Sequence, residues 1–322
     1  MKTLKKVLIL MLVTLMTFTW TACSNDKPQE ESKKEGNTTT ESSDGTETTY
    51  PFVFKDTAGD EITLEKVPER IVSVSASITE TLFAVGLGDQ IVGRDEFSNY
   101  PEETKEIKVV GNYVEPNTEL IIDLEPEVLF VSSPMPEDAT QLIKAAGIKT
   151  VVISDQTDVD GVLKNIQLIG KIGNVQETAN KLVEDLDIAR KEITDKVKDT
   201  KEKKVFVDIQ GFVSVGPDTF IDSMLQEINA VNIAADSGTA WPTLTLEKIV
   251  EENPDVYISL YPTVKEVKAN GGIQSVTAVK NDNIIHFPWG TEENNILSRS
   301  GPRVMKGLEF LAKAIHPEAF EK

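Results

Sequence analysis

The sequence predicts an α/β protein built from two lobes that one long helix joins. Three observations indicate this class. Short β-branched runs alternate with helical periods, a twelve-residue phrase occurs twice, and one uninterrupted amphipathic stretch lies near the middle of the 322 residues. Strands that alternate with helices at close spacing are typical of βαβ units, which form parallel sheets. We therefore expect a parallel sheet in each lobe.

The first lobe is assigned to residues 51–173. Its first βαβ unit has strand-like residues at 70–75 (R-I-V-S-V-S) and 90–93 (Q-I-V-G). The helix between them shows the capping-box spacing at Ser77 and Glu80, and Gly86 offers its C-terminal stop. The alternation continues with helices near 118–125, 136–146 and 159–170, and with strands at 127–131 and 150–153.

A single helix is predicted over residues 175–197, within a connecting segment at 174–200. Its apolar residues recur in steps of three and four, as on one face of a helix, and Val183 and Ile188 widen the stripe. No proline or glycine interrupts the pattern, so the helix should be about 35 Å long at 1.5 Å per residue.

The second lobe is assigned to residues 201–322, where the strand-helix alternation restarts. Strands are expected at 205–209, 256–260 and 284–287, and helices near 218–228, 246–252 and 301–315.

The repeated phrase reads E-L-I-I-D-L-E-P-E-V-L-F at 119–130 and E-K-I-V-E-E-N-P-D-V-Y-I at 247–258. Each copy begins with a glutamate, Glu119 or Glu247, and an aromatic residue lies six positions earlier in both, Tyr113 or Trp241. We interpret the repeat as the same helix-strand unit in each lobe.

The N-terminus predicts export. A basic start, a short apolar run and the small pair before Cys23 are typical of a secretory signal, and the run is too short for a convincing membrane span. Cys23 is the only cysteine, and its placement resembles the lipobox of bacterial lipoproteins, with Trp20 where leucine is usual. We predict a signal peptide at 1–22, lipidation of Cys23 and a flexible tether over 23–50. The alternative is an ordinary cleaved signal with an incidental cysteine.

Composition argues against several classes of function. The formal charge of −20 disfavours nucleic acid and charge-driven adhesion to anionic lipid, so the lipid is the expected membrane link. Only His286, predicted in a strand core, and His316, predicted exposed, are available for histidine chemistry. No glycine-rich phosphate loop occurs. We expect no enzyme activity and no cofactor; a carboxylate-based surface enzyme is the distant alternative.

Three further stretches resemble one family. S-N-Y-P at 98–101, W-P-T-L-T-L-E-K-I-V-E-E-N-P-D-V at 241–256 and S-G-P-R-V at 300–304, together with residues 71–93, are similar to bacterial substrate-binding proteins for metal chelates. These proteins serve ABC importers of cobalamin, ferric siderophores and haem. The resemblance implies a rigid linking helix, a ligand cleft between the lobes, a monomer on the outer face of the cytoplasmic membrane, and an ABC permease dimer as partner.

Ligands of open parallel sheets bind beyond the carboxyl ends of the strands. That rule and the resemblance together nominate eight ligand-binding residues: Phe97, Tyr113, Met135, Phe212, Trp241, Tyr261, Trp289 and Arg299. The strand-end rule also nominates Ser75, Ser132 and Gln210. A position in the core is the alternative for Trp241, and it has equal weight with the cleft for Phe212 and Trp289.

The resemblance implies that Glu119 and Glu247 dock on arginines of the permease. The alternative is that each only stabilises its own helix, because a carboxylate at the second helical position, after the predicted caps Asn117 and Thr245, complements the helix dipole.

The ligand is inferred from the scarcity of arginine. Anionic ferric chelates favour several cationic side chains in the cleft, and the chain offers few arginines for it, namely Arg94, Arg299 and Arg303, the last predicted to be structural. We therefore expect cobalamin or a related corrinoid, with a ferric siderophore or haem as the alternative.

Overall fold

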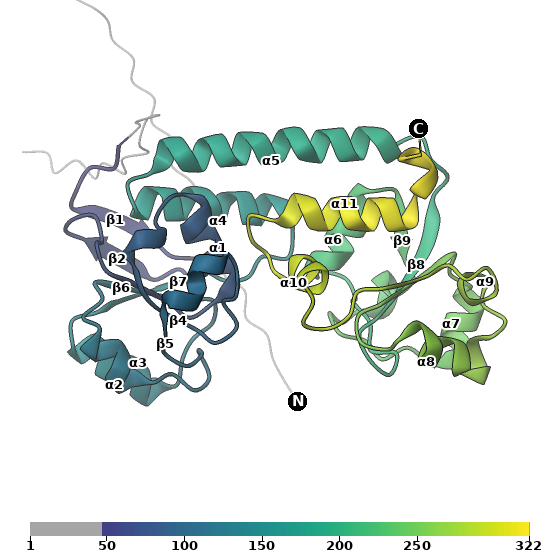
Figure 1. Cartoon of the computed structure of the whole chain (residues 1–322), viewed down its shortest axis with the longest axis horizontal. Helices are drawn as coiled ribbons and strands as arrows, with labels where there is room; N and C mark the ends of the chain where they lie inside the picture. Colours follow the sequence, from purple (N-terminus) through teal and green to yellow (C-terminus); the bar gives the residue numbers. More distant parts are fainter. Residues whose placement is uncertain (1–46, 322) are drawn as a thin grey trace, which may run out of the picture. The chain divides into compact units, whose positions relative to one another are not determined.

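The structure is a computed structural model that describes residues 47–321. The signal peptide, Cys23 and nearly all of the tether lie outside the described residues. Two parallel sheets and one antiparallel hairpin form the strand framework (Figure 1). The hairpin, which sequence reasoning missed, pairs β1 (Phe52–Lys55) with β2 (Glu61–Leu64).

The N-terminal lobe contains a five-stranded parallel sheet in the order β5-β4-β3-β6-β7. Its strands are β3 (Ile71–Ser73), β4 (Ile91–Arg94), β5 (Lys108–Val109), β6 (Val128–Val131) and β7 (Lys149–Val152). Its helices are α1 (Ala76–Ala84), α2 (Thr118–Asp123), α3 (Glu137–Ala145) and α4 (Val159–Ile172). Every residue of β6 is buried, as expected for a parallel strand that helices cover on both faces.

The C-terminal lobe contains a four-stranded parallel sheet in the order β11-β10-β8-β9. Its strands are β8 (Lys203–Asp208), β9 (Ala230–Asn232), β10 (Val256–Ser259) and β11 (Ile284–His286). Its helices are α6 (Phe220–Glu227), α7 (Leu246–Glu252), α8 (Val264–Ala269), α9 (Thr277–Lys280), α10 (Glu292–Ser298) and α11 (Val304–Ile315). Sequence reasoning missed β9, β5 and the helices α8 to α10, all of them short.

The repeated phrase marks a shared topology. The order β4-β3-β6-β7 in the first sheet matches β9-β8-β10-β11 in the second, with the strand of the repeat, β6 or β10, at the same interior position. The helix of the repeat, α2 or α7, directly precedes that strand in each lobe. The interpretation as one helix-strand unit used twice is therefore confirmed.

The long helix α5 spans Gln176–Val197 and packs against α4 and α11 (Figure 1). Ala179, Leu186 and Ile193 are buried at intervals of two turns, which confirms the predicted apolar face. Ile188 is exposed and does not widen that face, so this part of the prediction was wrong. The lobe boundaries at 173/174 and 200/201 stay a prediction.

Two local predictions fail because tertiary partners outcompete local ones. The capping box of α1 does not form: the N-cap is Ser75 without a side-chain cap, while Ser77 Oγ donates to Asp155 at 2.9 Å and Glu80 binds arginines. His316, predicted exposed, is fully buried, and its Nε2 lies 2.9 Å from the Ile228 carbonyl oxygen. Burial lowers the pKa of His316.

Candidate ligand-binding site

Two pockets lie at the carboxyl ends of the two sheets, as the strand-end rule predicts. The pocket of the C-terminal lobe measures about 190 Å³ and is bordered by Leu260 and Tyr261, which directly follow β10. The pocket of the N-terminal lobe measures about 170 Å³ and is bordered by Ser75 and Asp95, which follow β3 and β4. Ser298, at the end of α10, lines both pockets. We call the two adjoining pockets the cleft.

The C-terminal pocket carries an aromatic wall formed by Trp241, Tyr261 and Trp289. The rings of Tyr261 and Trp289 stack with their centroids 4.8 Å apart and their planes 17° from parallel. Trp241 and Trp289 are 61% and 63% exposed, which is unusual for such large apolar side chains. For both tryptophans the structure favours the cleft over the core.

A short backbone ladder holds Trp241 outward. Ser214 N donates to the Pro242 carbonyl and Gly216 N donates to the Ala240 carbonyl, each at 2.8 Å, so the backbone on both sides of Trp241 is fixed. The strands of this ladder approach closely at Gly216, where a Cβ would lie 2.0 Å from the Thr239 carbonyl oxygen. Glycine is required there because any larger residue would push the Trp241 segment away.

Two exposed aromatics, Phe97 and Tyr113, border the N-terminal pocket. Tyr113 sits in a tight turn that Asn112 closes, because its side-chain oxygen accepts from the backbone N–H groups of Val114 and Glu115 at 2.8 and 2.9 Å. Phe97 follows Asp95, whose buried carboxylate accepts from the Ser98 N–H at 3.1 Å. Burial raises the pKa of the Asp95 carboxyl, and the Ser98 hydroxyl bond opposes this shift.

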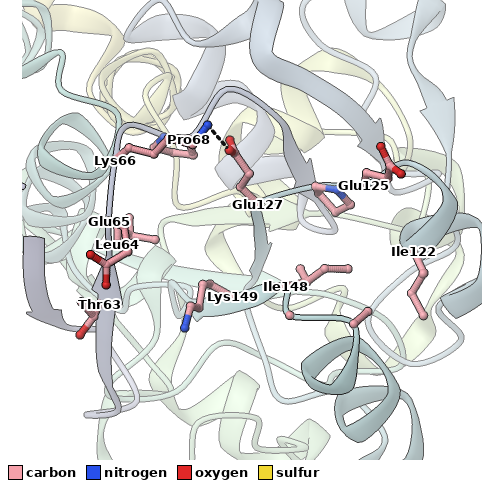
Figure 2. A pocket seen from close by; sticks show the side chains of 13 residues that line it. Thr63, Leu64, Glu65, Lys66, Pro68, Ile122, Glu125, Glu127, Ile148 and Lys149 are labelled. Carbon is pink, nitrogen blue, oxygen red and sulfur yellow. Dashed lines mark ion pairs between the residues drawn. The ribbon is translucent and has the colours of Figure 1, made fainter. Parts of the chain in front are cut away.

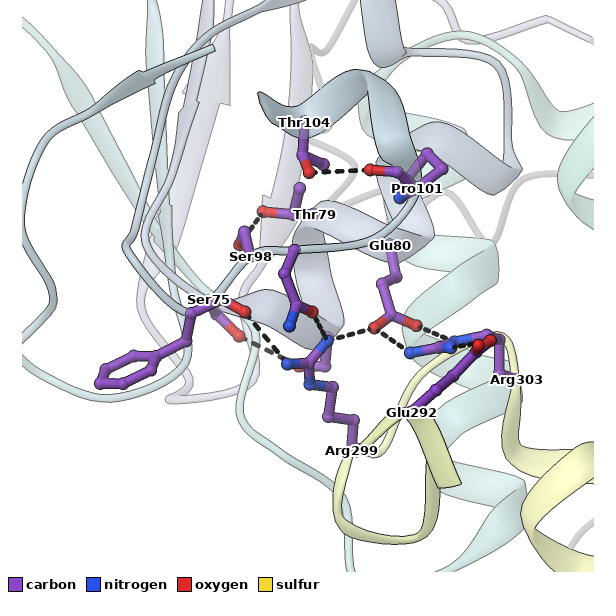
Figure 3. A network of polar contacts seen from close by, with 12 residues as sticks. Ser75, Thr79, Glu80, Ser98, Pro101, Thr104, Glu292, Arg299 and Arg303 are labelled. Carbon is purple, nitrogen blue, oxygen red and sulfur yellow. Dashed lines mark hydrogen bonds and ion pairs between the residues drawn. The ribbon is translucent and has the colours of Figure 1, made fainter. Parts of the chain in front are cut away.

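Arg299 borders the N-terminal pocket, although it follows α10 of the other lobe. Its Nη1 donates to Glu80 Oε1 at 2.7 Å and to Asn99 Oδ1 at 3.0 Å, and its Nη2 donates to the Phe97 carbonyl oxygen at 3.0 Å (Figure 3). The guanidinium is therefore fixed at the pocket edge, with its charge matched by a carboxylate.

Two of the nominated residues lie elsewhere. Met135 is buried in the core beside β6 and lines neither pocket, so the structure does not support a ligand contact. Phe212 is half-buried and packs on the core, with its ring centroid 6.3 Å from that of Phe206, which favours the core alternative. Both lie in the connection that follows a strand, β6 or β8, and the strand-end rule does not say which way a side chain in such a connection points.

Sequence reasoning missed several polar residues of the cleft, namely Ser77, Asp95, Asp155 and Ser298. Asp95 directly follows β4, so the strand-end rule applied to that strand would have found it. Ser132, which the rule did nominate, lines the N-terminal pocket, whereas Gln210 lines neither pocket.

A larger hollow of about 480 Å³ lies in the N-terminal lobe, away from the cleft (Figure 2). It is bordered by Lys149 and Glu127 near the amino ends of β7 and β6, the edge opposite to the one where parallel sheets bind ligands. Lys66 Nζ and Glu127 Oε1 pair at 2.6 Å across it, so two of its charged groups already have partners. We do not assign the site here.

The two glutamates of the repeat occupy equivalent places. Glu119 and Glu247 are exposed in the first turns of α2 and α7. Both predicted caps form: the Asn117 side chain accepts from the Leu120 N–H, and the Thr245 side chain accepts from the Lys248 N–H. This geometry fits both docking and helix stabilisation.

Within residues 47–321, no group of three or more His, Cys, Asp or Glu side chains is arranged to hold a metal ion. Among the helices of that same range, none combines the length and the apolar character that a membrane crossing needs.

Comparison with known proteins defines the class. The family model described as "Periplasmic binding protein" matches residues 71–289, and the chain belongs to this family. It is 32% identical over 310 residues to the uncharacterised ABC transporter substrate-binding lipoprotein YvrC of Bacillus subtilis, covering 93% of this chain and 94% of that protein. It is 27% identical over 281 residues to a cobalamin-binding protein of Halobacterium salinarum, covering 83% of this chain and 74% of that protein.

Solved structures share the fold. A possible iron-binding periplasmic solute-binding protein of Staphylococcus epidermidis superimposes with a TM-score of 0.69 at 28% identity, covering 77% of this chain and 99% of the other. The periplasmic vitamin B12-binding protein BtuF of Vibrio cholerae superimposes with a TM-score of 0.64 at 21% identity, covering 79% and 99%, which supports the fold alone. The two-lobed α/β architecture with parallel sheets is thus that of periplasmic binding proteins.

Proposed function

We propose that this chain captures a metal chelate outside the cytoplasm, cobalamin or a related corrinoid, and delivers it to an ABC importer. The observation that carries the proposal is the two-sided cleft, with an exposed aromatic wall on one lobe and a polar pocket with a paired arginine on the other. The names of the cobalamin-binding relatives support the same ligand class.

The two pockets adjoin, which favours a ligand that is large enough to contact both. They measure about 190 and 170 Å³, and each is smaller than the roughly 300 Å³ at which sites for drug-sized molecules begin. Because the pockets adjoin at Ser298, a ligand larger than either one contacts both lobes. A flat macrocycle also suits exposed aromatic faces, which contribute stacking and area burial without exact hydrogen-bond matching.

The charge of the cleft favours a ligand without strong negative charge. Asp95, Asp155 and Arg299 are the Asp, Glu, Lys and Arg residues that line it, and the arginine is already paired with Glu80. An anionic ferric siderophore would leave its charges without a cationic partner among these residues, and unpaired charge in a desolvated site is costly. A corrinoid, whose periphery is rich in amides, brings neutral hydrogen-bonding groups to the polar lining of the N-terminal pocket.

Haem or a ferric siderophore is the second candidate. The phenols of Tyr113 and Tyr261 lie on the two sides of the cleft, and tyrosine is a known axial ligand of haem iron. Structural neighbours described as possibly iron-binding or as haem-binding support this candidate.

We further propose the partners and the location. Glu119 and Glu247 sit at matching places in the two lobes, so an ABC permease dimer could engage them through two equivalent sets of cationic side chains. Cys23 is proposed as the lipidated N-terminus, which would hold a monomeric receptor on the outer face of the cytoplasmic membrane. Intact mass of membrane-extracted protein tests the anchor: a chain that starts at Cys23 with a diacylglycerol addition is expected, and a start elsewhere contradicts it.

Calorimetric titration tests the ligand. Purified protein is titrated with cobalamin, a ferric hydroxamate, a ferric catecholate and haem. We expect saturable binding of cobalamin with one site per chain. Tight binding of a siderophore or of haem without cobalamin would move the assignment to the second candidate, and tight binding of a free ion or a sugar alone would overturn the proposal.

A further inference from the structure

A buried carboxylate joins the two lobes. Glu80 belongs to α1 of the N-terminal lobe and is 2% exposed. It accepts from Arg299 Nη1 at 2.7 Å, and from Arg303 Nε and Nη2 at 2.7 Å each, in the paired geometry of an arginine–carboxylate fork (Figure 3). Both arginines come from the C-terminal lobe, where they lie between the end of α10 and the start of α11.

Arg303 is fixed on its remaining sides. Its guanidinium carbon lies 4.0 Å from the centroid of the Tyr100 ring, which belongs to the N-terminal lobe. Its Nη1 also lies 3.3 Å from Glu292 Oε1 at the start of α10. The sequence-based prediction that Arg303 is structural agrees with this placement, although its partner was not foreseen.

The same segment makes a second set of contacts with the N-terminal lobe. Ser300 Oγ donates to Asp155 Oδ1 at 3.1 Å and accepts from the Gln156 N–H at 3.1 Å. Gly301 lies against α1, where an added Cβ would be 3.4 Å from the Ser77 carbonyl oxygen. Residues 298–303, which we call the latch segment, thus connect α10 to α11 while resting on the other lobe.

The lobe junction has a second link, at α5. Arg190 on α5 donates to Asp160 of α4 at 2.6 Å and to both oxygens of Glu227 of α6, at 2.6 and 2.7 Å. The lobes are therefore tied at α5 and at the latch segment. Opening of the cleft about α5 requires the contacts of Glu80 to break, because Glu80 and its arginines lie on different lobes.

The cost of removing Glu80 fixes the position of the latch segment against α1. Removing one member of a buried ion cluster leaves the others desolvated and unpaired, which costs far more than the net contribution of the intact cluster to stability. Glu80 also has a local alternative as a helix-capping residue and does not adopt it. A neutral residue at position 80 would leave two arginines facing each other without a counter-charge between them, so the latch segment would move away from α1.

We propose that Glu80 is a positioning residue that latches the two lobes at a fixed separation and holds Arg299 at the edge of the ligand pocket. The separation of the lobes follows from the contacts themselves, while the consequence for ligand affinity rests on the proposed function. The latch explains how a cleft with a wall from each lobe is kept preformed.

Distance measurement between spin labels tests the latch without ligand. Labels are placed in the full chain through Ala145→Cys on α3 and Lys265→Cys on α8, both exposed, with Cys23→Ser to avoid a third label. The parent should give one narrow distribution. Glu80→Gln should broaden it about twofold or shift it, as hinge opening does. The control Glu292→Gln, which removes only the exposed contact with Arg303, should leave it unchanged.

A folded Glu80→Gln protein with the distribution of the parent would overturn the proposal, because a residue with a merely structural role changes the melting temperature and not the distance. If Glu80→Gln does not fold, Arg303→Lys answers the same question: it keeps the charge but loses the fork, so broadening supports the latch and an unchanged distribution contradicts it.

Affinity for cobalamin is the second readout. Glu80→Gln should weaken binding by about tenfold relative to Glu292→Gln, because part of the binding free energy is spent on closing the lobes. Unchanged affinity would refute the link to Arg299 and leave the distance result standing. If the parent binds no chelate, the proposed function fails, and the distance measurement still decides on the latch.

Discussion

Replacing Trp241 by alanine should weaken binding of the chelate by at least roughly tenfold, about 1.4 kcal/mol. Trp241 is 61% exposed in the pocket of the C-terminal lobe. A tryptophan presents up to about 250 Å², so a ligand that covers the exposed part buries roughly 150 Å² of it. At about 25 cal/mol per Å² this corresponds to about 4 kcal/mol at most. Ordering and association costs offset part of that gain, which gives the lower figure.

Calorimetry on the parent and on Trp241→Ala measures the difference directly, and quenching of tryptophan fluorescence supplies an independent signal. Leu142→Ala is the matched control, because Leu142 is also an exposed apolar side chain but lines neither pocket. The control should bind like the parent. Equal affinity of the parent and Trp241→Ala, with both folded, would refute the role of the aromatic wall.

Three further results are expected. Glu119→Arg or Glu247→Arg should leave ligand affinity intact and sharply reduce uptake by cells, whereas the control Glu137→Arg in the first turn of α3 should change neither affinity nor uptake; normal uptake by both variants would reduce these glutamates to helix stabilisers. Tyr257→Phe removes the buried hydroxyl that donates, at 2.6 Å, to the carboxylate at the end of β8, and should lower the free energy of unfolding by about 1.5–3 kcal/mol in denaturant titrations; a loss below about 0.5 kcal/mol would contradict the bond. Burial lowers the pKa of His316, so the unfolded chain binds a proton at this side chain more readily than the folded chain does. The stability from this group is therefore present above the unfolded pKa of about 6.5 and is lost as the pH falls below that value. His316→Gln should therefore flatten the pH dependence of unfolding between about pH 7 and 5 relative to the parent, and an identical slope would contradict the buried state.

Most of the fold is predictable because its elements are periodic. The strands at 128–131 and 256–259 are short apolar runs, and α5 shows a helical period over its whole length. The hairpin β1-β2 was missed because its four-residue strands are half-buried and carry little pattern. The capping box at Ser77 and Glu80 was wrong because partners that local spacing does not reveal bind both side chains: Asp155 of the same lobe binds Ser77, and arginines of the other lobe bind Glu80.

The candidate site was predictable where aromatic residues lie in loops. Tyr113 and Trp241 were found through the repeat, and each borders a pocket. That they sandwich one ligand from opposite sides stays a prediction. Met135 shows the limit of such reasoning: a side chain after a strand can turn into the core, and only packing decides this.

The central claim, that the cleft holds a corrinoid, is tested most directly by the ligand that accompanies the protein when it is purified from its native cells. The absorbance spectrum and the mass of the released molecule identify it without a choice of candidates. We predict the spectrum and mass of a corrinoid, at no more than one molecule per chain. A ferric siderophore, haem or a compound that contains no metal would contradict the account.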